Sequence, residues 1–134
     1  MRPALSLGFF GLFGRSPSLR AFDVALRAVD LHPKLVPEAV KLTAVRTLMD
    51  ERAEADPSPE ATRATAEILA YCMLGADAFA GANGVPLTDR TEARIDAALA
   101  HGASLDAKLV LLALHAKVIQ PSVVDHFGLE VASD

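Results

Sequence analysis

The chain has 134 residues, a length that supports one hydrophobic core and leaves no room for two. Hydrophobic residues make up 51% of it and aromatic residues only 5%, so alanine, leucine and valine carry the apolar content, which favours helices over strands. The formal net charge of −4 combines eight basic and five acidic residues in positions 1–52 with five basic and twelve acidic residues after them. Neither part has the strong basic patch that nucleic-acid binding requires, so we expect no nucleic-acid partner.

Residues 1–15 are predicted to form an apolar N-terminal arm, followed by one helical domain over residues 16–134. We interpret its large apolar side chains as interaction residues: Leu5, Leu7, Phe9, Phe10, Leu12 and Phe13. The run is short, is broken by glycines and lacks a small-residue cleavage site, so we do not interpret it as an export signal. Burying one such side chain is worth roughly 1.5–3 kcal/mol, so we expect the domain itself, a second copy or another protein to cover the arm. A membrane surface is the weaker alternative, because only two arginines flank the run.

The first helix is predicted over residues 17–31. Ser16 and Pro17 occupy the N-cap and first-turn positions that these residue types favour. Charged residues recur every three or four positions and therefore share one narrow stripe: Arg20, Asp23, Arg27 and Asp30. The other positions are mostly apolar, so we expect the helix to be buried on most sides.

Two further helices are predicted over residues 37–53 and 59–74, separated by a charged loop that ends in proline. The second half of the later helix carries no charge on any side, so we expect it inside the domain. A weak turn of helix over residues 77–82 leads to a turn at Asn83 and Gly84.

A fourth helix over residues 89–101 is polar on most sides and is expected on the periphery. The fifth, over residues 105–119, is apolar for nearly two turns, and we expect it to be the central helix with Leu109 and Leu112 almost fully buried. A short sixth helix follows over residues 123–127. The fold class is therefore all-α: a compact single-domain bundle of five or six helices with a central apolar fifth helix.

Metal and cofactor sites are not expected. The histidines lie too far apart in sequence for the close helical pairs that bind zinc: His32, His101, His115 and His126. The single cysteine, Cys72, lies in an apolar stretch without a basic neighbour and is interpreted as a core residue. A lone cysteine also excludes an internal disulfide and fits the reducing cytoplasm, where we expect this protein.

His115 and Tyr71 are the catalytic candidates. His115 lies on the apolar fifth helix and could accept a proton if an acid lies beside it, although a core histidine with one bonded ring nitrogen fits the same position. No nearby nucleophile or oxyanion donor accompanies it in the sequence.

Two functions remain open at this point. The preferred hypothesis is a non-catalytic interaction or regulatory module that self-associates, as a homodimer or with another protein. The alternative is an enzyme or a small-ligand-binding protein with a pocket between the third and fifth helices, near Tyr71 and His115. A buried cavity with convergent polar groups would favour the second hypothesis, and a flat apolar face would favour the first.

Overall fold

The computed structural model describes residues 16–53 and 57–129. These residues are 80% helical and include no strand, which confirms the all-α class. The predicted arm and all six of its interaction residues, from Leu5 to Phe13, lie outside the described residues.

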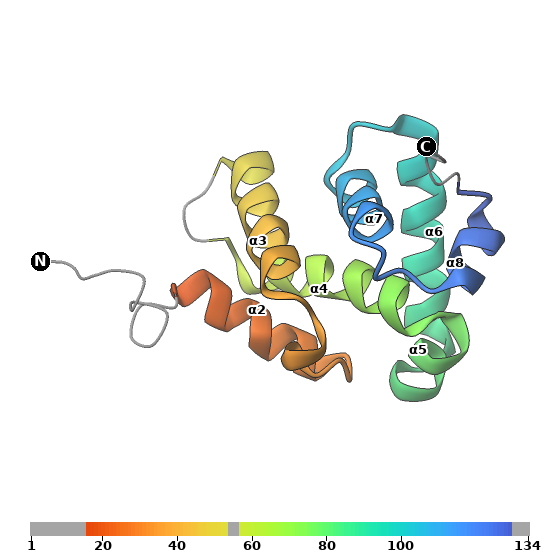
Figure 1. The fold of residues 1–134 in the computed structure, drawn as a ribbon, viewed down its shortest axis with the longest axis horizontal. Coiled ribbons are helices and arrows are strands. Elements are labelled where there is room, and N and C mark those ends of the chain that lie inside the picture. The colour runs from red at the N-terminus through yellow and green to blue at the C-terminus, as the bar shows by residue number, and fades with distance from the viewer. Residues whose placement is uncertain (1–15, 54–56, 130–134) are drawn as a thin grey trace, which may run out of the picture.

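Within the described ranges, seven α-helices and one short 3-10 helix follow one another along the chain (Figure 1). They are α2 (Pro17–Ala28), η1 (Pro33–Leu35), α3 (Glu38–Arg52), α4 (Pro59–Leu74), α5 (Ala76–Asn83), α6 (Val85–His101), α7 (Leu105–His115) and α8 (Pro121–Phe127). The count exceeds the predicted five or six because the weak turn over residues 77–82 is a full helix, α5. No single helix in the described part has the length and hydropathy to cross a membrane; α6 and α7 reach them only as a pair that is bent by 94°.

The helix starts follow the sequence signals. Three serines precede three helices, and each side-chain oxygen accepts a backbone N–H from the first turn at 3.1 Å: Ser16 from Leu19, Ser58 from Ala61, and Ser104 from Ala107. This contact satisfies one of the donors that every helix start leaves free.

Some helix ends differ from the prediction. α2 stops at Ala28 and α7 at His115, and in the loops that follow them Asp30 and Lys117 have φ of 68° and 61°. The start of α6 is earlier than predicted because Pro86 lies in its first turn, where a missing N–H costs no hydrogen bond.

The central helix is α4 rather than the predicted α7. α4 runs through the middle of the molecule and contacts five other helices, α2, α3, α5, α6 and α7 (Figure 1). Its residues 68–72 are completely buried. On α7, Leu109 is fully buried as predicted, but Leu112 is only half-buried and Leu111 is 43% exposed. The prediction was wrong because α7 packs against α3, α4 and α6 and leaves its remaining side to solvent.

α2 is exposed beyond its charged stripe, so it is less buried than the sequence indicates. Val24 is 67% exposed, and Ala21 and Ala28 are exposed as well. The reason is position: α2 lies at one end of the bundle and packs mainly on α3 and α4, which leave this side of the helix partly open (Figure 1).

Candidate functional site

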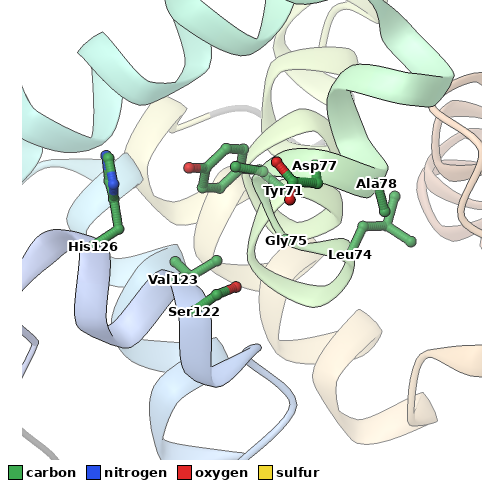
Figure 2. A pocket seen from close by; sticks show the side chains of 9 residues that line it. Tyr71, Leu74, Gly75, Asp77, Ala78, Ser122, Val123 and His126 are labelled. Carbon is green, nitrogen blue, oxygen red and sulfur yellow. The ribbon is translucent and has the colours of Figure 1, made fainter.

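A cavity of about 340 Å³ lies beside Tyr71, where α4, α5 and α8 meet (Figure 2). Its wall combines apolar and polar side chains, and the polar ones are Tyr71, Asp77, Ser122 and His126. In Figure 2, Ser122, Val123 and His126 come from α8, and Tyr71 and Asp77 come from α4 and α5.

Two residues far apart in sequence build this junction. Gly75 joins α4 to α5 with φ of +89°, a conformation that side-chain-bearing residues rarely adopt, and a Cβ here would meet Ser122 Oγ at 3.4 Å. Gln120 anchors the start of α8 to the end of α4: its backbone N–H donates to the Cys72 carbonyl at 2.8 Å, and its side-chain amide donates to the Met73 carbonyl at 2.9 Å. These bonds satisfy carbonyls that a helix end otherwise leaves free.

Tyr71 is fully buried and its hydroxyl has a partner. The ring packs edge-on against Phe79 and Phe127, with centroid distances of 5.6 and 6.1 Å. The hydroxyl donates to Glu92 Oε2 at 2.6 Å. Burial raises the pKa of Tyr71 well above its usual range, and the hydrogen bond and charge of Glu92 raise it further. Tyr71 therefore keeps its proton near neutral pH, which disfavours a role as a general acid or base.

The structure does not bring His115 to this cavity. His115 is exposed at the end of α7 and is not among the residues that line the hollow. The histidine that does line it is His126, which sequence reasoning missed because its neighbours in space come from α4 and α5. In the described part of the chain, no hydrogen bond joins His126, Ser122 or Asp77 to one another, so the cavity holds no assembled pair of nucleophile and base.

The Cys72 thiol and the Arg94 guanidinium, which could otherwise serve a reaction, have structural roles. Cys72 is buried, and this burial raises the pKa of its thiol to about 12, so it stays protonated. Arg94 on α6 forms ion pairs with Asp106 on α7 at 2.9 Å and with Glu67 on α4 at 3.1 Å. The described residues contain no group of three or more His, Cys, Asp or Glu side chains that could hold a metal ion.

A second hollow, which we call the α2 groove, has a different character. Its volume is about 540 Å³, and it is lined by Ala21, Val24, Ala25, Ala28, Pro57, Pro59, Thr62 and Arg63. Val24, Ala25 and Ala28 lie three, four and seven positions after Ala21, so the four residues form one stripe along the helix. Pro57 and the first turn of α4 form the opposite wall.

The α2 groove can bind apolar side chains but carries no catalytic chemistry. Arg63 is its only ionisable residue among the described lining, and an always-charged guanidinium is unsuited to proton transfer. The signal in the sequence is the surplus of apolar positions on α2, which predicts burial on most sides of this helix. Comparisons of the chain with protein-family models, with curated proteins and with solved structures found no match.

Proposed function

We propose that this chain is a non-catalytic protein-interaction module that self-associates, with the α2 groove as its binding surface. The observation that carries the proposal is Val24, which is 67% exposed at the middle of an apolar stripe that the rest of the fold leaves open. Contiguous apolar hollows of this kind are typical of surfaces that another chain covers.

Single exposed apolar residues elsewhere do not carry the same argument. Leu35, Leu42, Val85, Leu99 and Leu111 are also exposed, but isolated apolar residues are ordinary on protein surfaces. Val24 differs because it lines one hollow together with three alanines of its own helix and with Pro57 and Pro59.

A second copy of the chain fits the α2 groove. In a two-fold symmetric dimer the same patch serves both partners, so the α2 stripe of one copy would pack against that of the other. The small side chains of Ala21, Ala25 and Ala28 beside Val24 allow two helices to approach closely, because helix separation depends on the side chains at the contact.

The test is sedimentation equilibrium of the full-length protein over about 1–500 μM, a range in which weak protein interfaces dissociate. The wild type should approach dimer mass. Val24→Asp should remain monomeric, because the interface would bury one carboxylate from each copy, and this desolvation is costly even beside Arg63. Leu111→Asp is the matched control, since Leu111 is an exposed apolar residue on α7, and it should dimerise as the wild type does. A wild type that stays monomeric, or a Val24→Asp variant that dimerises normally, would contradict the proposal.

Binding of a small ligand beside Tyr71 is the second candidate. It is supported by the convergence of Asp77, Ser122 and His126 on one cavity. A fragment screen by NMR tests it: hits should be lost in Ala78→Trp, which fills the cavity, and kept in Val24→Asp. Hits that survive Ala78→Trp, or the absence of any hit, would argue against this candidate.

A further inference from the structure

The wall of the cavity beside Tyr71 carries one full charge, and this charge is negative. It belongs to Asp77, which is exposed on α5 and forms no ion pair with another described residue. Ser122 and His126, from α8, are exposed on the same wall (Figure 2). Their side chains also form no hydrogen bond within the described ranges, so all three groups are open to a ligand.

The three helices that build the cavity bring no basic side chain near it. α5 and α8 contain no lysine or arginine, and the single arginine of α4, Arg63, lies eight residues before Tyr71, about 12 Å along the helix. Lys117, in the loop before α8, lines a different hollow. The cavity wall, as far as the structure describes it, therefore has no lysine or arginine to attract an anion.

Two carboxylates behind the wall add to its negative charge. Glu92, on α6, accepts the hydrogen bond of the Tyr71 hydroxyl at 2.6 Å. Burial, the bond and charge of Glu92, and the charge of Asp96 all raise the pKa of Tyr71 above its usual range. Both carboxylates therefore lie close enough for their charge to act at this end of the cavity.

The helix starts at the cavity contribute the opposite charge, but less of it. A helix N-terminus carries about half of a positive charge, which would favour an anion. The starts of α5 and α8 together amount to about one positive charge, against the three carboxylates of Asp77, Glu92 and Asp96. Asp77 lies in the first turn of α5 itself, so it offsets that helix start directly. The balance favours a cation.

We propose that the cavity beside Tyr71 binds a small organic cation, namely a primary ammonium group on a short apolar body. An ammonium group has three donors and no acceptor. The wall offers three acceptors for them, which are the Asp77 carboxylate, the Ser122 hydroxyl and a ring nitrogen of neutral His126. The inference rests on the ligand binding proposed above as the second candidate function, because it names the chemical class of that ligand.

The rest of the cavity sets the size and character of the ligand body. Leu74, Ala78 and Val123 line it and can cover apolar atoms (Figure 2). Its volume of about 340 Å³ lies at the low end of the range of ligand pockets, roughly 300–1,000 Å³. A body of a few carbon atoms or one aromatic ring therefore fits the cavity.

NMR titration of ¹⁵N-labelled full-length protein tests the selection by charge. The probes are phenethylammonium chloride, the neutral 2-phenylethanol and the anion 3-phenylpropionate, compared at constant ionic strength. The ammonium probe should bind about two- to fivefold more tightly than the alcohol, because an ion pair with an exposed carboxylate is weak, and the anion should bind least. Equal binding of the ammonium probe and the alcohol, or tightest binding of the anion, would overturn the inference.

Variants of two aspartates test whether Asp77 makes this selection. Asp77→Asn should remove the preference for the ammonium probe over the alcohol, since it keeps the size of the side chain and removes its charge. Asp77→Glu should retain the preference. The matched control is Asp125→Asn, which removes a carboxylate of α8 outside the cavity wall and should behave as the wild type does. Each variant is judged by the ratio of two affinities, so a small loss of stability does not affect the result. An Asp77→Asn variant that keeps the wild-type ratio would overturn the inference.

The inference and the candidate function on which it rests fail in different ways. If the alcohol and the ammonium probe bind equally and Ala78→Trp abolishes both, the cavity binds small ligands without selecting a cation, and the inference alone is wrong. If none of the three probes shifts the signals of residues that line the cavity, both are wrong. Self-association through the α2 groove is tested separately, and Val24→Asp should show the same probe preference as the wild type.

Discussion

The cavity beside Tyr71 and the groove along α2 differ in the side chains that line them and in how far the fold itself uses those side chains. At the cavity, the most deeply buried polar group already has its partner, since the Tyr71 hydroxyl donates to Glu92. At the groove, Val24 lies in an apolar stripe and remains 67% exposed, although residues of α4 line the same hollow. The hydroxyl at the cavity is therefore bonded within the fold, whereas Val24 at the groove is left largely exposed. Exposed apolar surface of this kind is typical of sites that another chain covers, and the proposed function rests on it.

The largest expected difference between the two regions concerns stability. Leu69→Ala removes a fully buried side chain from α4 and should lower the free energy of unfolding by about 2–5 kcal/mol. Leu112→Ala should cost less, because Leu112 is half-buried, and Val24→Ala should change stability by no more than about 0.5 kcal/mol, as surface substitutions do. Urea unfolding measures all three. A cost at Val24 equal to that at Leu69 would show that the groove is part of the core.

The helix starts could be predicted from the sequence, whereas the central helix could not. Ser16 identified the start of α2, because an N-cap bond spans only three residues, and Ser58 and Ser104 hold the same position before α4 and α7. The choice of central helix could not be predicted, since α4 and α7 both contain apolar stretches and only their neighbours in space decide which is surrounded.

The candidate sites were less accessible to sequence reasoning than the helices. The Tyr71 cavity depends on the Gly75 turn and on Gln120, which contacts residues more than forty positions earlier, so His126 rather than His115 reaches it. The stripe of Ala21, Val24, Ala25 and Ala28 is visible in the sequence, but its exposure depends on where α2 lies in the bundle.

A smaller change in stability is expected when the hydrogen bond between Tyr71 and Glu92 beside the cavity is removed. Tyr71→Phe removes the hydroxyl that donates a hydrogen bond to Glu92, and we expect the free energy of unfolding to fall by about 1–2 kcal/mol. Hydrogen bonds to charged groups contribute more than neutral ones, but the contribution is reduced here because Glu92 is partly exposed to water. Glu92→Gln, which keeps an acceptor, should cost less. If Tyr71→Phe is neutral in urea unfolding, the hydroxyl is free to serve a ligand instead, and the cavity gains weight as a functional site.

Alkaline pH should weaken the same region. The folded-state pKa values of Cys72 and Tyr71 are both raised, so the unfolded chain releases their protons first, from ordinary values of 9.0 and 10.0. Between the unfolded and folded pKa values the folded state holds more protons, so stability falls as pH rises, by at most about 1.4 kcal/mol per pH unit for each group. Unfolding should therefore become easier above pH 9, and the slope above pH 10 should be smaller in Tyr71→Phe. A wild-type stability that rises over this range would contradict the assignment.

The measurement that tests the central claim most directly is methyl NMR of the full-length protein during dilution from dimer to monomer. The account predicts that the methyl signals of Ala21, Val24 and Ala28 shift as the dimer dissociates, because the α2 groove is the surface that changes its surroundings. The methyl signals of Leu111, on α7, and of Ala78, beside Tyr71, should stay where they are. Shifts confined to Leu111 or Ala78, with the α2 groove silent throughout, would place the interface elsewhere and contradict the account.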